Sequence, residues 1–384
     1  GADVVDFGML ATDMLYYGVA RDHFDGGAQI TASHNPKEYN GVKLVRQQAF
    51  PLSGEAGISD IRDMILVDRI PTPTTRGTLT HEHLLDDYLE HILSFVDLSG
   101  LRPFRLVLDA GNGMGGLVAP ALFDRLPFKV TTLCFDIDGT FPTHEANPLI
   151  AENRIDLVEQ VKKDDADVGI AWDGDADRCF FVDGDGEFVS GDFVTSLLAE
   201  AFLRKEEGAK IIYDVRASHA VKDTVTAFGG SALMNRVGHA FFKKRMREED
   251  AAFGGEVTGH YYFRNNFFAD NGFIPALLIL ELMSTRNMTL KQLLSPLRQK
   301  YFISGEINTE MPDRTAVKST IERIKNAYTD GRTYQMDGLS VEYPMWHFNV
   351  RPSNTEPLIR LNLESNSQTS MEARRDEVLA LIRA

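Results

Sequence analysis

Three short apolar runs, each ending on an aspartate and a turn, constrain the fold of this chain more than any other feature. They are Leu106–Leu108 ending at Asp109, Val168–Trp172 ending at Asp173, and Ile211–Tyr213 ending at Asp214. Amphipathic stretches typical of helices follow, for example Ser196–Glu207 and Pro275–Met283. Strands that alternate with helices predict mixed sheets covered by helices, with functional groups on the loops that leave the strands. We therefore expect a multi-domain α/β protein.

Length and composition narrow the class of protein further. The chain has 384 residues, enough for two to four domains, and its 43% hydrophobic and 25% charged fractions are those of a soluble globular protein. No apolar stretch approaches the roughly 20 residues that span a bilayer, and no signal-peptide pattern opens the chain. Cys134 and Cys179 both lie in apolar runs that predict strands, so we expect two buried thiols and a reducing, cytoplasmic location.

The formal net charge of −16 argues against nucleic acid or an anionic membrane as a partner. A small anionic substrate remains compatible with this charge, because local fields decide its binding. Basic residues gather at Lys243, Lys244, Arg245 and Arg247, and Arg351 stands apart from them. For most of the first group we expect a solvated helix face.

The stretch Thr31-Ala32-Ser33-His34-Asn35-Pro36 carries the clearest chemical signal in the chain. Small neighbours leave the Ser33 hydroxyl open to a bulky reactant, and Asn35-Pro36 interrupts regular structure, so Ser33 is expected on a loop. His34 adjoins it, and Lys43 follows ten positions later. An isolated serine of this kind is more often part of a polar turn before a strand, so the assignment depends on the loops that follow.

A second loop, Asp173-Gly174-Asp175-Ala176-Asp177-Arg178, places three carboxylates at alternating positions on an expected surface loop. They can converge on one hard cation, and Mg²⁺ leaves positions open for water or for an oxygen of a phosphorylated Ser33. A calcium EF-hand also begins D-x-D-x-D, but Arg178 replaces its sixth-position glycine and Gly184 its twelfth-position glutamate. A magnesium site is therefore favoured over a calcium loop or a solvated acidic turn.

Two later loops offer groups that suit a phosphorylated sugar. In Gly255-Glu256-Val257-Thr258-Gly259-His260, the Glu256 carboxylate and the Thr258 hydroxyl can bond vicinal sugar hydroxyls. Arg351-Pro352-Ser353-Asn354-Thr355-Glu356-Pro357 precedes a predicted strand, Leu358–Leu363, and its arginine and two hydroxyls can hold phosphate without a Walker lysine. Taken singly, each loop is a weak signal, and a surface turn explains the last one equally well.

Together and in this order, the four loops resemble those of the α-D-phosphohexomutases of the bacterial phosphomannomutase/phosphoglucomutase type. The resemblance covers nearly the whole chain. It implies four domains around a central cleft, of which the first three are similar mixed-sheet α/β domains and the fourth is a smaller α+β domain. The implied divisions are 1–80 with the phosphoserine loop, 81–187 with the metal loop, 188–298 for sugar recognition and 299–384 for phosphate binding.

Breaks in the sequence fit these divisions. They fall at Pro71–Gly77, at the turn Asp183–Gly186 and at Leu294–Pro296, and a helix is expected at about His83–Val96. The chain begins at Gly1, already within an expected strand, and lacks the strand, helix and arginine-containing phosphate motif that the family carries upstream. The first domain is therefore expected to be incomplete at its N-terminus. This keeps open a catalytically impaired sugar-phosphate-binding fragment as an alternative function.

The resemblance implies an intramolecular phosphotransferase, an isomerase that interconverts hexose 1-phosphate and hexose 6-phosphate of mannose or glucose. Ser33 would carry the phosphate, and glucose 1,6-bisphosphate or mannose 1,6-bisphosphate would be both intermediate and activator. Phosphoglucosamine mutase, with the same chemistry on an amino sugar, is the alternative enzyme. The expected partners are thus Mg²⁺ and a hexose phosphate, for a protein that acts as a monomer or homodimer.

The resemblance also implies a role for individual loop residues. The implied catalytic residues are Ser33, His34, Lys43 and Arg178; the metal ligands are Ser33, Asp173, Asp175 and Asp177; the substrate-binding residues are Arg216, His239, Glu256, Thr258, Arg351, Ser353, Asn354 and Thr355. Lys43 would need its pKa lowered by cationic neighbours to act as a base, and Arg178 acts first through its charge. The family has serine in place of Thr258, so the hydroxyl is kept. For His239 alone, a structural histidine is the more frequent case.

Two other motifs favour different folds and are weaker. Gly111–Gly116 satisfies G-x-G-x-x-G after a strand, with Asp136 twenty residues on, as in dinucleotide-binding domains. Phe135-Asp136-Ile137-Asp138-Gly139-Thr140 matches the D-x-D-G-T signature of haloacid dehalogenase phosphatases, a superfamily that includes phosphomannomutases of unrelated fold with an aspartyl phosphate. The sequence around both motifs also resembles the second domain of the hexomutases. Neither alternative explains the other loops.

Overall fold

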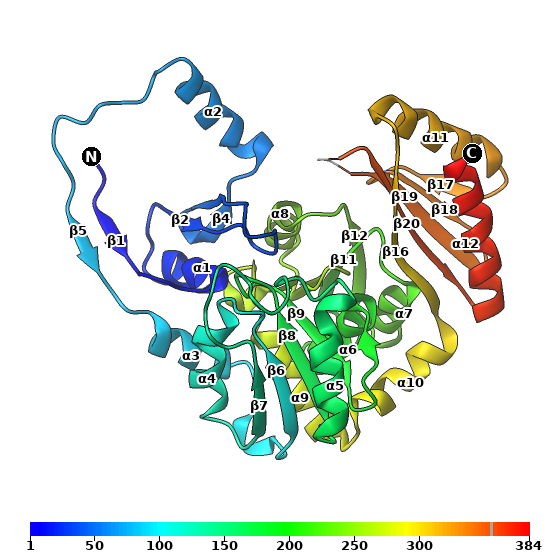
Figure 1. Cartoon of the computed structure of the whole chain (residues 1–384), viewed down its shortest axis with the longest axis horizontal. Helices are drawn as coiled ribbons and strands as arrows, with labels where there is room; N and C mark the ends of the chain where they lie inside the picture. Colours follow the sequence, from blue (N-terminus) through cyan, green and yellow to red (C-terminus); the bar gives the residue numbers. More distant parts are fainter. Residues whose placement is uncertain (354–355) are drawn as a thin grey trace. The chain divides into compact units, whose positions relative to one another are not determined.

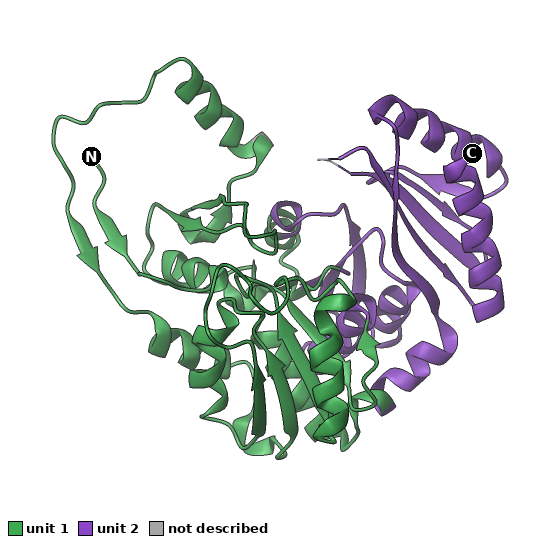
Figure 2. Ribbon diagram, in the orientation of Figure 1, with its two compact units in different colours: residues 1–189, 243–253, 258–291 green, residues 190–242, 254–257, 292–384 purple. Residues whose placement is uncertain are grey.

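The computed structural model describes residues 1–353 and 356–384 (Figure 1). The chain divides into two compact units (Figure 2). Unit 1 contains residues 1–189, 243–253 and 258–291, and unit 2 contains residues 190–242, 254–257 and 292–384. None of the helices in the described part of the chain combines the length and the apolar character that a membrane span requires.

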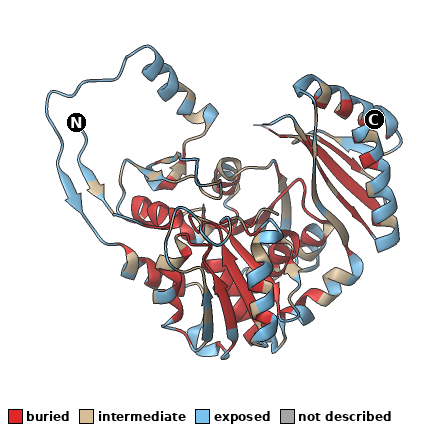
Figure 3. Cartoon of the chain, viewed as in Figure 1, coloured by how far each residue is buried: buried red, intermediate tan, exposed pale blue. Residues whose placement is uncertain are grey.

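The main sheet of unit 1 has five strands in the order β10-β9-β8-β6-β7, in which β6, β7 and β8 are parallel. Its strands are β6 (Arg105–Asp109), β7 (Lys129–Leu133), β8 (Val168–Trp172), β9 (Cys179–Asp183) and β10 (Phe188–Val189), and the helices of this region are α3 (Leu85–Leu93), α4 (Gly115–Phe123) and α5 (Ile155–Lys163). Every residue of β8 and β9 is buried (Figure 3), which explains why the run that forms β8 is apolar throughout. The predictions of β8 and of the turn between β9 and β10 are confirmed.

The first 81 residues of unit 1 form two small sheets. β1 (Val4–Asp6) pairs in parallel with β5 (Leu79–His81), and β2 (Gly26–Ile30), β3 (Val42–Arg46) and β4 (Phe50–Pro51) form an antiparallel sheet. Helix α1 (Thr12–Arg21) is buried along most of its length, whereas α2 (Ile58–Leu66) buries none of its residues. The loop that carries Ser33 therefore joins two strands of the three-stranded sheet.

Helix α9 (Ile274–Arg286) is deeply buried in unit 1. Its residues from Ile274 to Ser284 are all buried. The helix predicted at Pro275–Met283 is confirmed. Pro275 suits the first turn, where its missing N–H costs no hydrogen bond, and Asn287 ends the helix in the left-handed conformation. The antiparallel strands β14 (Tyr261–Phe263) and β15 (Ala269–Asp270) also belong to unit 1.

Three elements have their residues divided between the two units: α8 (His239–Glu249), β13 (Phe253–Gly255) and α10 (Leu290–Lys300). The chain break predicted at Leu294–Pro296 is wrong, because α10 continues through Pro296. Burial of Leu290, Leu293 and Leu294 stabilises this helix enough to offset the hydrogen bond that the proline removes.

Unit 2 contains a parallel strand pair and an antiparallel sheet. β11 (Lys210–Asp214) pairs with β12 (Ser231–Asn235), near helices α6 (Gly191–Lys205) and α7 (His219–Ala227). The antiparallel sheet has the order β16-β20-β19-β18-β17. Its strands are β16 (Phe302–Glu310), β17 (Arg332–Tyr334), β18 (Leu339–Glu342), β19 (Trp346–Pro352) and β20 (Leu358–Ser365), and helices α11 (Arg314–Ala327) and α12 (Gln368–Arg383) pack on it.

One face of this antiparallel sheet is apolar and the other is polar. Phe348, Val350 and Leu361 form a core with side chains of α11 and α12. Because side chains alternate along a strand, the residues between them lie on the opposite face. These are His347, Asn349 and Arg351 on β19, and Arg360, Asn362 and Glu364 on β20. The polar face is therefore the one that can carry chemistry.

The two cysteines differ in environment. Cys179 begins β9 and is buried, as expected, but Cys134 follows the end of β7 and is half-buried. Its backbone is left-handed, with a φ of 55°, because the chain turns at this point. The prediction of two buried thiols in strands is therefore wrong for Cys134.

Candidate active site

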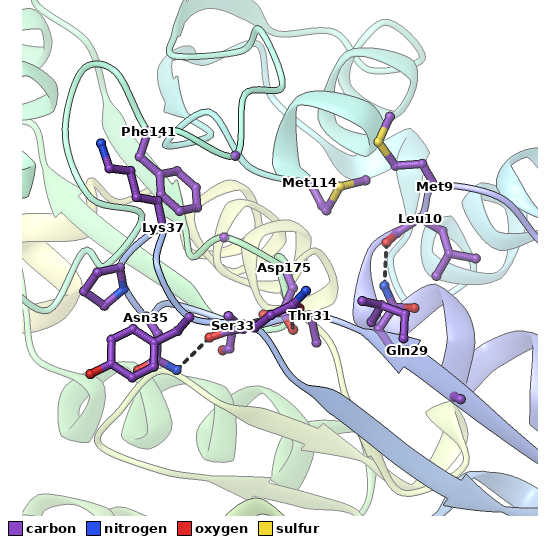
Figure 4. Close-up of a pocket in the computed structure, with 18 of the residues that line it drawn as sticks. Met9, Leu10, Gln29, Thr31, Ser33, Asn35, Lys37, Met114, Phe141 and Asp175 are labelled. Atoms are coloured by element: carbon purple, nitrogen blue, oxygen red, sulfur yellow. Dashed lines mark hydrogen bonds between the residues drawn. The ribbon is translucent and has the colours of Figure 1, made fainter.

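Ser33 lies on the loop between β2 and β3 in an unusual backbone conformation. Its φ is 56°, in the left-handed region that residues with side chains rarely adopt. The Ser33 amide donates a hydrogen bond of 2.8 Å to Oγ1 of Thr31, and the Asn35 side chain donates one of 2.8 Å to the Ala32 carbonyl (Figure 4). These bonds offset part of a strain of about 1–2 kcal/mol. They hold the Ser33 loop in one defined turn.

Asp173, Asp175 and Asp177 follow β8 on one loop and converge. They are only 0%, 3% and 1% exposed, and one oxygen of each lies within 4.8 Å of those of the other two. The expectation of a surface loop is therefore wrong. The loop is covered by the Ser33 loop and by α1, whose Thr12 amide donates to the Asp175 carbonyl at 3.0 Å.

Two glycines allow three loops to pack against one another here. A Cβ on Gly174 would lie 2.4 Å from the carbonyl oxygen of Ser33, and one on Gly113 would lie 2.5 Å from the carbonyl oxygen of Gly174. Backbone atoms do not tolerate such distances, so both positions require glycine. The G-x-G-x-x-G segment thus packs on the aspartate loop, and its central glycine, Gly113, is explained without a dinucleotide. Asp136 of the D-x-D-G-T motif is exposed after the end of β7.

The Ser33 hydroxyl is in contact with three charged or polar side chains. Its Oγ donates to Oδ2 of Asp173 at 3.2 Å, accepts from Nη2 of Arg178 at 3.3 Å and lies 3.2 Å from Nδ1 of His34. His34 also contacts Arg178. Burial, reinforced by the charge of Arg178, lowers the pKa of His34 to about 3, so the ring is neutral at physiological pH.

Lys43 pairs with the aspartate loop. Its Nζ lies 2.7 Å from Asp175 and 2.5 Å from Asp177. Burial alone lowers the pKa of Lys43, but the attraction of the two carboxylates outweighs it and raises the pKa well above its usual range. The nearest charged neighbours of Lys43 are thus acidic, so its pKa is not lowered as a base would require, and Lys43 is held in its charged form.

The aspartate loop has the charge and the free oxygens that a hard cation requires. Its three carboxylates pair directly with two cations, Lys43 and Arg178, which leaves a formal excess of one negative charge among these five side chains. Burial raises the pKa of Asp173 to about 7, although Arg178 Nε lies 3.1 Å away. Oδ1 of Asp175 and Oδ1 of Asp177 are buried and have no hydrogen-bond partner among the described residues. Carboxylate oxygens are the ligands that Mg²⁺ prefers, so these residues fit a magnesium ion.

A second polar cluster adjoins the aspartate loop and was not predicted. Nδ1 of His260 lies 3.0 Å from Asp270 and 3.7 Å from Asp177. Lys243, which is 0% exposed, places Nζ 2.7 Å from Asp270 and 3.6 Å from the centre of the Tyr16 ring. The expected solvated helix face is therefore wrong for Lys243, because its partner lies on a different element. The sequence signal for His260 was its place in the third loop, directly after Gly259.

The Ser33 loop borders a cavity of about 560 Å³. Met9, Met114 and Phe141 line it together with Ser33 and Asp175 (Figure 4). This volume lies within the range of small-molecule sites, which combine an apolar lining with a few polar groups. The hydroxyl that the sequence singled out thus lies on the wall of a ligand-sized space.

In unit 2, four side chains form one ionic network around Glu306, which the sequence did not single out. Oε2 of Glu306 lies 3.1 Å from Arg216 and 3.2 Å from Arg351, and Oε1 lies 2.9 Å from Arg360. Burial alone raises the pKa of Glu306, but these arginines outweigh it and lower the pKa to about 2. Arg216 also pairs with Asp214 at 2.9 Å. Two arginines predicted to bind substrate are thereby joined through one carboxylate.

The other residues predicted to bind substrate lie near chain turns. Glu256 is buried and accepts a hydrogen bond from the Gly238 amide at 3.1 Å, and His239 begins α8 and is half-buried. Thr258 is half-buried between β13 and β14, and Ser353 is buried directly after β19. The predictions for Asn354 and Thr355 fall outside the described residues.

Comparisons with known protein families match almost the whole chain. The models described as phosphoglucomutase/phosphomannomutase α/β/α domains I, II and III match residues 1–68, 86–186 and 190–301, and the model of the C-terminal domain matches residues 306–381. A phosphomannomutase of Escherichia coli is 42% identical over 394 residues, which cover 100% of this chain and 86% of that protein. Phosphohexose mutases of Xanthomonas campestris pv. campestris are 42% identical over 389 residues, with the same shares covered.

Solved structures show the same similarity. A phosphoglucomutase/phosphomannomutase family protein of Burkholderia thailandensis superposes with a TM-score of 0.89 at 32% identity, covering 100% of this chain and 83% of that one. Aspergillus fumigatus N-acetylphosphoglucosamine mutase, solved with GlcNAc-6P and magnesium, has a TM-score of 0.64 at 14% identity, covering 100% of this chain and 96% of that one. The second likeness is one of fold alone.

Proposed function

The chain belongs to the phosphoglucomutase/phosphomannomutase family and is a phosphohexomutase, and on this premise we propose that it interconverts the 1- and 6-phosphates of mannose, glucose or both. Ser33 carries the phosphoryl group in the active enzyme. The observation that carries this proposal is the position of Ser33 Oγ, 3.2 Å from Asp173 and 3.3 Å from Arg178, on the wall of a ligand-sized cavity.

The proposed reaction transfers a phosphoryl group twice. First, the P–O bond to Ser33 Oγ breaks and a P–O bond forms to the free hydroxyl of the sugar monophosphate, which loses its proton. The product is glucose or mannose 1,6-bisphosphate. Its other phosphoryl group then returns to Ser33, and the sugar oxygen that it leaves regains a proton. The bisphosphate can therefore also act as activator, because it phosphorylates any enzyme that has lost its phosphate.

Positioning and charge supply most of the catalysis in phosphoryl transfer. Arg178, 3.3 Å from Ser33 Oγ, stabilises the negative charge on that oxygen when its bond breaks. His34 is neutral and its Nδ1 lies 3.2 Å from the same oxygen, so it can exchange a hydrogen bond with Ser33 Oγ, but a pKa of about 3 makes it a weak base. Lys43, held as a cation, can act as a proton donor. We assign these three side chains to proton transfer and charge stabilisation around Ser33.

A magnesium ion fits the aspartate loop. Asp173, Asp175 and Asp177 would hold it, together with an oxygen of Ser33 or of its phosphate. When bound, Mg²⁺ supplies charge neutralisation for the serine phosphate. The buried Oδ1 atoms of Asp175 and Asp177, which accept no hydrogen bond from the described residues, support this assignment.

Recognition of the sugar phosphate is assigned to the later loops. Glu256 and Thr258 bind the ring hydroxyls, and Arg216 and His239 complete this subsite. Arg351 and Ser353, with Asn354 and Thr355, bind the phosphate that does not react. The charge of Arg351 and its place on the polar face of the sheet support this role.

Peptide mass spectrometry after incubation with glucose 1,6-bisphosphate tests the proposal. We expect phosphate on Ser33, stable in acid. A hydroxylamine-labile phosphate on Asp136 would instead establish an aspartyl-phosphate mechanism. Turnover assays with mannose, glucose and glucosamine 1-phosphates, each with the bisphosphate present, then identify the preferred sugar.

Replacing Arg351 with alanine is expected to weaken binding of hexose phosphate by about 1.5–3 kcal/mol, because a charge-assisted hydrogen bond to phosphate is lost. This corresponds to a dissociation constant about 10- to 150-fold higher, measurable by calorimetry. Arg360→Ala is the matched control, since Arg360 pairs with the same Glu306 from the neighbouring strand. An equal loss in both variants would mean that disturbance of Glu306 is the cause and that Arg351 does not hold phosphate.

A further inference from the structure

A third polar cluster lies on the polar face of the unit 2 sheet, outside the proposed reaction. His347 on β19 and Glu364 on β20 are paired across the two strands, and His219 is the first residue of α7. The Nδ1 atoms of both histidines face the same oxygen, Oε1 of Glu364, at 3.9 Å for His219 and 3.8 Å for His347. These distances are too long for hydrogen bonds. All three potential ligand atoms nevertheless lie within 4.8 Å of one another.

Two atoms of this cluster are buried without a partner. His347 is 8% exposed and Glu364 5%, and within the described residues neither Nδ1 of His347 nor Oε2 of Glu364 has a hydrogen-bond partner. Each such buried polar group costs about 1–3 kcal/mol. Both side chains also line a cavity of about 20 Å³, which is enough for one water-sized species. The cluster therefore has unsatisfied ligand atoms and space beside them.

The surroundings of the histidines are those of metal ligands. A metal-bound histidine usually hydrogen-bonds through its other ring nitrogen to a backbone carbonyl or a carboxylate. The backbone of Ala217 interacts with the His347 ring, and Nε2 of His219 faces Glu342 at 3.7 Å, which is slightly too long for a hydrogen bond. Arg216, which also lines the cavity, is neutralised by Asp214 and Glu306 at 2.9 and 3.1 Å. Its charge is therefore balanced before any cation enters.

We propose that His219, His347 and Glu364 form a binding site for a divalent transition-metal ion, with Zn²⁺ as the probe. Two imidazoles and one carboxylate suit such an ion, whereas Mg²⁺ prefers oxygen ligands alone. Tetrahedral bonds of about 2.0–2.2 Å place ligand atoms about 3.4 Å apart. The two imidazole rings are stacked, with centroids 3.9 Å and planes 20° apart, so their in-plane lone pairs are nearly parallel. His219, the more exposed of the two, must therefore turn out of the stack to share one ion with His347 and Glu364. The fourth position faces the cavity and can hold water.

The ion would connect parts of unit 2 that are far apart in sequence. His219 lies in the region matched by the domain III model, and His347 and Glu364 lie in the region matched by the C-terminal model. Binding at this cluster therefore fixes the start of α7 against the two strands that carry Arg351 and Arg360. We expect Zn²⁺ to raise the Tm of the protein, because the folded chain binds it and the unfolded chain lacks the assembled site.

Zinc titration of chelator-treated protein, in excess Mg²⁺ and against a chromophoric chelator, tests the proposal. We expect one site per chain, with an affinity that falls at least about tenfold in His347→Gln and in Glu364→Gln. Both variants keep the side chain polar and close in size, and near-UV circular dichroism checks that they fold. The increase in Tm on adding Zn²⁺ should disappear with them.

His144→Gln is the matched control, because Nε2 of His144 lies 3.1 Å from Asp109 and 3.7 Å from Sγ of Cys134, in a second possible metal cluster. This variant should bind Zn²⁺ as the unchanged protein does. Bound Co²⁺ should show ligand-field bands without a thiolate charge-transfer band. A thiolate band, loss of binding in His144→Gln, binding unchanged in both glutamine variants, or no site in the unchanged protein would each overturn the proposal.

Discussion

Replacing Ser33 with alanine is expected to lower mutase turnover by more than about 10³-fold, because alanine lacks the oxygen that forms the phosphoester. The neighbouring hydroxyl of Thr31 cannot take over. It accepts a hydrogen bond from the Ser33 amide at 2.8 Å and donates to Asp175 at 3.1 Å. Turnover is measured with hexose 1-phosphate and the bisphosphate activator. Binding of hexose phosphate, measured separately, should change little, because its proposed contacts lie in the later loops.

Ser94→Ala is the control for this variant. Ser94 is exposed in the same unit, and its hydroxyl donates to the His91 carbonyl at 2.6 Å. Its removal should leave turnover unchanged. The left-handed backbone at Ser33 costs alanine about as much as serine, since both carry a Cβ, so the fold should be kept. Substantial turnover in Ser33→Ala would show that another side chain carries the phosphoryl group.

Strands were predicted well from the sequence where a continuous run of apolar residues determined them. The apolar run that forms β8 is buried on both faces, so its limits coincide with the structure. Helix ends were predicted less well. The helix expected at 196–207 spans Gly191–Lys205, because Ser190 caps it by accepting a hydrogen bond from the Asp192 amide. A cap depends on one side chain and leaves little trace in hydrophobic periodicity.

The sequence also predicted the convergence of the aspartate loop, but not its burial or its counter-ions. Alternate spacing brings Asp173, Asp175 and Asp177 to one side wherever the loop lies. Lys43 comes from a distant strand, and its 2.7 Å contact with Asp175 joins positions 132 apart. The sequence showed only that Lys43 would need a lowered pKa to act as a base, and in the structure the pKa is raised. Charge balance in a buried site is a property of the tertiary structure.

Glu306 and Lys243 likewise have ionic partners that the sequence alone did not predict. Glu306 joins Arg216 and Arg360 across 90 and 54 positions, and no local motif marks it. Lys243 lies among basic residues that suggest an exposed face, yet it is buried against Asp270 and Tyr16. A buried lysine is stable only with a partner, and that partner is set by packing. Local sequence motifs therefore identify reactive groups more reliably than they identify the distant charged groups that neutralise them.

The negative charge of the aspartate loop is the basis of the second large effect that we expect, a loss of turnover when one carboxylate is neutralised. Three carboxylates against Lys43 and Arg178 leave one net negative charge, which attracts a divalent cation to the loop. A phosphate on Ser33 adds about −1.5 to −2 charges beside the loop. Without a dication, this charge would adjoin Asp173, whose Oδ2 lies 3.2 Å from Ser33 Oγ, and would repel it. Removing one carboxylate charge should therefore weaken both the binding of the ion and the phosphorylated state.

Asp175→Asn is accordingly expected to lower turnover by about 10²- to 10³-fold and to raise the Mg²⁺ concentration needed for half-maximal rate. The amide oxygen can still accept from Thr12 and Thr31, which donate to Asp175 at 2.6 and 3.1 Å, so the fold should be kept. Asp185→Asn is the matched control, since Asp185 lies on the exposed turn after β9 and contacts Lys291. That change should leave rate and Mg²⁺ dependence unaltered. If Asp175→Asn behaved like the control, Asp175 would not be a magnesium ligand, and the unbalanced charge of the loop would need another role.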